Sequence, residues 1–143
     1  YDYKGNKISS SYYTVSYAKG CKNVGKYKVT IKFKGNYSGT LTAYFTIVRK
    51  ESKVEKLTAA KKSLKVKISK VSSQASGYEI QYSTSSKLMS AKTKKVTSYK
   101  TTSVTLKSLK AKKTYYVRVR TYKTVGGKKY YSGWSTVKYK KTK

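Results

Sequence analysis

The chain contains no histidine and no proline, a single cysteine, and only four acidic residues among its 143 positions. Without histidine and with so few carboxylates, the sequence offers no nucleophile–base arrangement and no paired-carboxylate site for acid–base catalysis. The same shortage leaves no cluster of zinc or calcium ligands, and no glycine-rich phosphate loop is present. We therefore expect a protein that is not an enzyme and that holds no cofactor and no metal ion.

The single cysteine, Cys21, excludes an intrachain disulfide. Its thiol has no histidine to activate it, so we do not expect a reactive role. A free thiol fits either a reducing compartment or a secreted protein that does not use disulfides. Long hydrophobic runs are also lacking, because no stretch reaches the roughly 18 apolar residues that a membrane-spanning helix needs. We expect no membrane insertion.

Large apolar residues are scarce as well. Leucine, isoleucine, valine and phenylalanine together make up about 18% of the chain, and the formal net charge is +31, a composition typical of disordered proteins. Two features favour folding instead. The chain has 17 tyrosines, which bury large areas, and its apolar residues alternate strictly with polar ones, as in strands with one buried face. The sequence therefore predicts an all-β fold with a thin, tyrosine-rich core.

Lysine supplies 32 of the 35 basic residues. Such an excess attracts polyanions and opposes compaction through self-repulsion. A solvated lysine face that keeps the protein soluble explains the charge as well as a specific anionic partner does. Base reading favours the arginine fork over lysine, so we expect no specific nucleic acid partner.

Residues 1–48 show short alternating segments separated by glycine and asparagine turns. Three strands are predicted, over 13–17, 27–34 and 41–47. In the first of them, Val15 and Tyr17 should point toward a core because they alternate with polar residues. The turn at Gly35-Asn36 should join the other two strands as a hairpin.

Four segments of this part resemble a bacterial immunoglobulin-like repeat: Tyr-Thr-Val-Ser-Tyr (13–17), Asn-Val-Gly (23–25), Gly-Asn-Tyr-Ser-Gly-Thr (35–40) and Phe-Thr-Ile (45–47). The pattern lacks the opening strands of such a repeat, so we expect a truncated module and a chain that is a segment of a longer protein. Repeats of this kind occur in large surface proteins of Gram-positive, often gut-dwelling, bacteria. The resemblance implies an extracellular location, at the bacterial cell surface or secreted.

Residues 49–56 lack periodicity and are predicted to form a short polar linker. Alternating segments resume from 57 to 143. Strands are predicted over 64–68, 77–82, 94–99, 103–106, 115–122 and 132–139. Gly126-Gly127 is typical of a hairpin turn. Short strands at this spacing predict a β-sandwich.

Leu109 is followed by a lysine-rich turn and then by Tyr115, Val117 and Val119 on one side of a strand. This order resembles the corner between the E and F strands of fibronectin type III domains, in which the tyrosine hydroxyl bonds to the turn backbone. The family usually has a core tryptophan where this chain has Ile68, which implies a smaller core or one filled by tyrosine. The chain is thus predicted to contain two tandem β-sandwich modules, 1–48 and 57–143.

Polar and aromatic side chains share the predicted outward face of the second module. They are Glu79, Gln81, Tyr116, Arg118, Arg120 and Tyr122, with Tyr130 and Tyr131 on the neighbouring hairpin. One interpretation is structural: a cross-strand Glu–Arg pair, with tyrosine rings covering the sheet. The other is a binding patch, because interface cores are enriched in tyrosine and arginine.

The domain resemblances and this face together predict a non-catalytic adhesion segment that recognises a host protein, with an immunoglobulin or a matrix protein conceivable. Two alternatives stay open. One is binding of an anionic cell-wall polymer or acidic glycan through the lysine charge, and the other is a passive structural spacer without a ligand. In each case we expect a monomeric segment of a longer chain.

Overall fold

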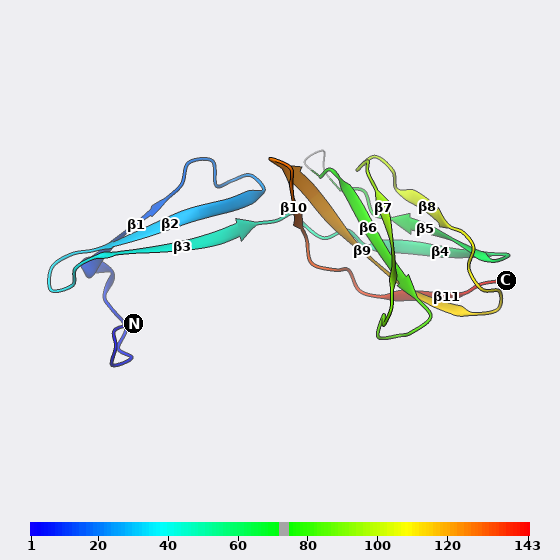
Figure 1. Cartoon of the computed structure of the whole chain (residues 1–143), viewed down its shortest axis with the longest axis horizontal. Coiled ribbons are helices and arrows are strands. Elements are labelled where there is room, and N and C mark those ends of the chain that lie inside the picture. The colour runs from blue at the N-terminus through cyan, green and yellow to red at the C-terminus, as the bar shows by residue number, and fades with distance from the viewer. Residues whose placement is uncertain (72–74) are drawn as a thin grey trace. The chain divides into compact units, whose positions relative to one another are not determined.

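The computed structural model describes residues 1–71 and 75–143, and its regular elements are almost entirely strands (Figure 1). These residues form two compact units, Tyr1–Ile47 and Val48–Lys143. Each unit has its own sheet or sheets. The predicted all-β class is therefore confirmed.

The N-terminal unit is one antiparallel sheet in the order β1-β2-β3. A short 3-10 turn precedes the sheet, and the elements are Ser10–Tyr12, β1 (Tyr13–Tyr17), β2 (Gly25–Phe33) and β3 (Thr40–Ile47). The central strand pairs with both neighbours because its alternating aromatic and β-branched residues suit a pleated, half-covered surface. The three strands predicted from alternation are thus confirmed.

The apolar face of this sheet is only partly covered. Val15 and Tyr17, which were expected to point inward, expose 41% and 63% of their surface. Tyr27 is half-buried and packs on the Phe45 ring, with 5.8 Å between the centroids. Within this unit the described residues form a single sheet with no second sheet facing it. The sandwich predicted for residues 1–48 is therefore one open layer in the structure.

The C-terminal unit contains two sheets (Figure 1). One has the strand order β4-β5-β8, and the other has the order β10-β9-β6-β7, with β11 also paired to β9. The strands are β4 (Val54–Ala60), β5 (Ser63–Ile68), β6 (Gly77–Ser83), β7 (Lys92–Val96), β8 (Ser103–Leu106), β9 (Thr114–Val125), β10 (Lys128–Tyr131) and β11 (Lys138–Lys141). All these pairs are antiparallel. The sandwich predicted for this part of the chain is present.

The core of the C-terminal unit lies between its two sheets and follows the period-two pattern. On β5 the inward apolar residues are buried, whereas the intervening lysines are exposed. Tyr78 on β6 is also fully buried, and its hydroxyl donates to the Tyr99 carbonyl at 2.9 Å and accepts from the Val71 amide at 3.2 Å. A buried phenol with both bonds made adds packing area without an unsatisfied polar group. Tyrosine therefore fills part of the core, as Ile68 at the family's tryptophan position had indicated.

The turn before β9 has the geometry expected of the tyrosine corner. The Lys110 amide donates a hydrogen bond to the Tyr115 hydroxyl at 3.0 Å, and Leu109 is buried in the core. The Leu109 amide also donates to the Lys62 carbonyl at 2.9 Å, which ties the turn to the β4–β5 hairpin. The corner predicted from the sequence is confirmed, and it fixes the way in which β9 enters the sheet.

Several predicted boundaries differ from the structure: the strand expected over 94–99 spans Lys92–Val96, for example, and two other segments differ more. The linker expected over 49–56 already contains the start of β4, and Ser52 is fully buried with its hydroxyl donating to the Ser69 carbonyl at 2.8 Å. The last strand, predicted from Ser132, begins only at Lys138. In the expected linker and in the segment before β11, serine hydroxyl groups bond the chain to the sandwich. Because these contacts are polar, no alternating apolar pattern marks either segment.

We predict that Tyr115→Phe lowers the free energy of unfolding by about 1 kcal/mol, because the Lys110 amide loses its acceptor in a partly buried turn. Tyr116→Phe, one residue further along β9, is the matched control, since its hydroxyl makes no hydrogen bond found among the described residues. Denaturant unfolding of both variants measures the difference. Equal midpoints for the two variants would show that the corner bond contributes nothing.

Candidate functional site

The segment between β10 and β11 runs beside β9 without forming a regular strand. Ser132 donates its amide to the Thr121 carbonyl, and its hydroxyl accepts from the Thr121 amide, both at 3.0 Å. Ser135 forms the same pair of bonds with Val119, at 2.8 and 3.0 Å. Ser132 and Ser135 are three residues apart, whereas their partners Thr121 and Val119 are two residues apart. The segment therefore does not follow β9 in a regular strand register. Trp134, between the serines, lies over the outer face of β9.

Trp134 contacts both arginines of β9. Its ring centroid is 4.5 Å from Cζ of Arg118 and 4.3 Å from Cζ of Arg120. Arg120 also lies 3.9 Å from the ring centroid of Tyr131 on β10. Each contact of this kind contributes about 0.5–1 kcal/mol at exposed sites and more where water is excluded. We call Arg118, Trp134, Arg120 and Tyr131 the arginine–aromatic stack.

Two side chains of β6 hold the guanidinium groups of the stack. Gln81 accepts with Oε1 from Nε and Nη2 of Arg118, at 3.0 and 2.8 Å. Glu79 accepts with Oε2 from Nε and Nη2 of Arg120, at 3.0 and 2.7 Å, and its Oε1 accepts from the Tyr131 hydroxyl at 3.3 Å. The strand register explains these pairs, because Glu79 stands opposite Arg120 and Gln81 stands opposite Arg118.

Two residues expected on the solvent face are buried instead. Glu79 and Tyr122 expose only 4% and 5% of their surface. Glu79 is covered because the Arg120 guanidinium and the Tyr131 hydroxyl both bind its carboxylate. Tyr122 stands opposite Gly77, where the missing side chain leaves room for the phenol, and Tyr131 packs on it at 6.1 Å between centroids. The expectation that these two side chains lie exposed on the solvent face is therefore wrong.

The enclosed carboxylate affects the two tyrosines beside it. Burial raises the pKa of Tyr122, and the negative charge of Glu79 raises it further. The pKa of Tyr131 is raised by burial first, then by the charge of Glu79 and by the hydrogen bond that it donates to this carboxylate. Both phenols are therefore held in the protonated form more strongly in the folded protein than in the unfolded chain.

The remaining residues of the predicted face lie at its rim. Tyr116 is half-buried and stacks on Tyr139 of β11 with 5.6 Å between centroids, and Tyr139 is 68% exposed. Tyr130 is half-buried on β10 and, as the neighbour of Tyr131 along a strand, points to the opposite face. Trp134 had no predicted role. The signal that could have revealed it is the Ser-Gly-Trp-Ser order, with hydroxyl acceptors on both sides of the indole.

The described part of the C-terminal unit, with its two sheets and its tyrosine corner, matches a known family. The model of that family, described as fibronectin type III domain, matches residues 52–138. The chain belongs to the fibronectin type III family. The matched range contains the tyrosine corner and the whole arginine–aromatic stack. Fibronectin type III domains are typically non-catalytic binding and scaffold modules of cell-surface proteins and are commonly extracellular.

A solved structure resembles this fibronectin type III chain in fold. The crystal structure of chicken CNTN1 FN1-FN3 domains matches with a TM-score of 0.55 and 21% sequence identity. The match covers 84% of this chain and 43% of that chain, so the present chain spans less than half of the solved one. No curated protein sequence matches the chain. At this identity the likeness shows the fold alone.

The geometry of the stack favours the structural interpretation of this face. Nε and Nη2 of Arg118 donate to Gln81 and those of Arg120 donate to Glu79, so the stack fastens β6, β9 and the segment after β10 to one another. Within residues 1–71 and 75–143, no group of three or more acidic, histidine or cysteine side chains is placed to hold a metal ion. In the same ranges, no helix is long and apolar enough to cross a membrane.

We predict that Trp134→Ala lowers the free energy of unfolding by about 2 kcal/mol, because two cation–π contacts and the partial burial of the indole are lost together. Trp134→Phe is the conservative variant and should lose less, since it keeps an aromatic face between the arginines. Denaturant unfolding compares the two. A loss below about 0.5 kcal/mol for the alanine variant, the range of ordinary surface substitutions, would contradict a structural role.

We predict that Glu79→Gln lowers the pKa of both Tyr122 and Tyr131, because the charge that helps to raise them is removed. A group whose pKa is raised in the folded state stabilises the protein at pH values below its unfolded pKa. This stabilisation is lost as the pH rises through the folded pKa. These phenols should therefore destabilise the wild type as they ionise above their ordinary pKa of 10.0.

Titration of tyrosine absorbance against pH measures this effect. Glu55→Gln is the control, because it removes the same charge from an exposed pair with Lys67 at 3.4 Å. It should leave the two phenols unchanged. A Glu79→Gln titration that overlays the wild type would contradict the assigned cause.

Proposed function

We propose that this fibronectin type III chain is a binding segment of a bacterial surface or secreted protein, and that it attaches to an anionic cell-wall polymer or acidic glycan. The observation that supports this partner is the shortage of counter-charges for the lysines. Among the described residues only two ion pairs occur, Lys67 with Glu55 at 3.4 Å and Arg120 with Glu79 at 2.7 Å. Most of the ammonium groups are therefore left to solvent or to a partner.

Exposed lysines lie in rows on several strands of the C-terminal unit. The rows are Lys56, Lys65 and Lys67 on β4 and β5, Lys92, Lys94 and Lys95 on β7, and Lys138, Lys140 and Lys141 on β11. Like charges on neighbouring strands repel each other. A polyanion that neutralises several of them relieves this repulsion and releases its own counterions, which drives binding.

The arginines are poorly placed to provide the same attraction. Arg118 and Arg120 already bind Gln81 and Glu79, and their planes lie against aromatic rings. A partner that took the Nε and Nη2 donors would have to break these contacts first, and that cost would be subtracted from the affinity. This arrangement favours the lysine rows over the arginine–aromatic stack as the attachment surface.

Recognition of a host protein, such as an immunoglobulin or a matrix protein, is the second candidate function. It is favoured by the aromatic pair at the rim, because Tyr139 is 68% exposed and stacks on Tyr116. Tyrosines in such positions are frequent hot spots of protein interfaces. A passive spacer is the remaining alternative, and it requires that neither kind of ligand binds.

We predict that the whole chain binds purified wall teichoic acid, and that its affinity falls at least about tenfold between about 50 and 200 mM sodium chloride. The reason is that each neutralised charge adds to the salt dependence. Neutral dextran is the control polymer and should not bind. Calorimetric titration at several salt concentrations makes the measurement.

An affinity for teichoic acid that does not change with salt would contradict this proposal. Salt-independent binding to immunoglobulin or to a matrix protein, weakened by Tyr139→Ala, would support the second candidate in its place. Binding to none of these would leave the spacer.

A further inference from the structure

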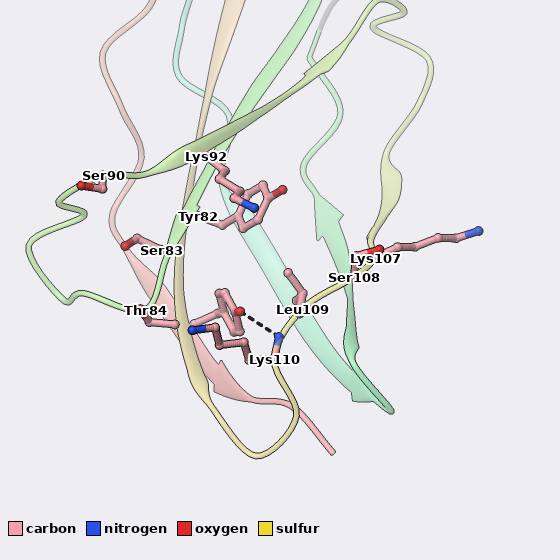
Figure 2. A pocket seen from close by; sticks show the side chains of 10 residues that line it. Tyr82, Ser83, Thr84, Ser90, Lys92, Lys107, Ser108, Leu109 and Lys110 are labelled. Atoms are coloured by element: carbon pink, nitrogen blue, oxygen red, sulfur yellow. Dashed lines mark hydrogen bonds between the residues drawn. The ribbon is translucent and has the colours of Figure 1, made fainter.

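A cavity of about 410 Å³ opens where the β6–β7 loop approaches the turn before β9 (Figure 2). Its volume lies within the range of about 300–1,000 Å³ that is typical of small-ligand sites. One wall consists of residues 82–84 together with Ser90 and Lys92, and the other consists of residues 107–110. Tyr115, the tyrosine of the corner, also lines the cavity.

Hydrogen bonds within the domain hold both walls in place. The Ser83 hydroxyl donates to the Met89 carbonyl at 2.8 Å and accepts from the Ser85 amide at 3.1 Å, which closes the β6–β7 loop. The opposite wall is fixed by the bond from the Lys110 amide to the Tyr115 hydroxyl at 3.0 Å. A cavity that is already formed binds a ligand without the cost of ordering its loops.

The lining combines positive charge, hydroxyl groups and an aromatic ring. Three lysines contribute to it, and no aspartate or glutamate does. In Figure 2 the Lys92 side chain lies near the Tyr82 ring and Lys110 extends toward Thr84, whereas Lys107 points away from the cavity. An anionic group in the cavity would thus meet ammonium groups from two walls. Hydroxyl groups on the same ligand would find serine and threonine partners.

We propose that this cavity binds one anionic sugar or polyol unit, with its carboxylate or phosphate between Lys92 and Lys110 and its carbon framework against Tyr82. The inference rests on the proposed function and deepens it, because it adds a defined subsite to the diffuse charge of the lysine rows. Carboxylate and phosphate share the chemistry that an ammonium group binds. Uronic acid polymers and polyol phosphate polymers are therefore the two possible sources.

The test compares two double variants of the full chain that remove the same charge. Lys92→Gln with Lys110→Gln changes the cavity, whereas Lys100→Gln with Lys128→Gln changes two exposed lysines that neither line it nor belong to the lysine rows. The probes are a short glucuronic acid oligosaccharide and a glycerol phosphate oligomer, with a neutral glucan oligomer as the blank. Calorimetry at one low salt concentration gives the affinities, and circular dichroism checks that each variant folds.

The cavity variant should bind the preferred anionic oligomer about tenfold more weakly than the wild type, and the control variant should change by less than about twofold. The oligomer that binds more tightly identifies the source of the anion. In the wild type and the control variant, this oligomer should also shift the amide resonances of Ser83 and Ser108. Shifts confined to other parts of the domain would overturn the assignment.

Failure of this inference differs from failure of the proposed function. If the wild type binds teichoic acid and both double variants lose affinity equally, the lysines act only as diffuse charge and the subsite is overturned. The same conclusion follows if the wild type binds the polymer but neither oligomer. If the wild type binds no anionic polymer at all, the proposed function itself fails.

Discussion

The burial of alternating apolar and tyrosine side chains between two sheets has to offset the mutual repulsion of 32 lysines. A net charge of +31 opposes any compact state, and hydrophobic burial is the favourable term that grows with the area removed from water. Strands such as β5 reconcile the two, because every second side chain enters the core and the lysines between them keep their ammonium groups in water. Tyr78 shows how a bonded phenol replaces the scarce large aliphatic residues.

Arginine and lysine have separate tasks in this fibronectin type III domain. Arg118 and Arg120 are planar and less strongly hydrated than lysine, so they can lie against Trp134 and still bind Gln81 and Glu79. The result is a polar layer on the outer face of β9 that holds three segments of the sheet together. The lysines carry compact, strongly hydrated charges on flexible stems. They contribute less to the architecture and are the groups that remain free to meet an anion.

Most strands and the tyrosine corner could be predicted because each has a local signal, either alternation or the fixed spacing from Leu109 to Tyr115. β4 was not predicted as a strand. The burial of Glu79 and Tyr122 could not, because alternation assigns a side chain to a face and does not say what covers that face. The place of Trp134 depends on serine hydroxyls that accept from β9, a pattern without periodicity. In the N-terminal unit, alternation also predicted the strands, but it did not predict that their apolar face is exposed. Whether a second sheet covers that face cannot be read from the pattern of any single strand.

The segment held by serine hydroxyls also divides the outer border of its sheet. On the side of β9 away from β6, the border consists of β10 and β11, each four residues long and rich in lysine, with the irregular segment between them. A continuous border with free amides and carbonyls is a template on which another chain can add a strand and start aggregation. Here the irregular segment interrupts the border, and the lysines of β10 and β11 would repel the same strands of another copy. Copies of the domain that crowd together are therefore poorly suited to pair strands along this border.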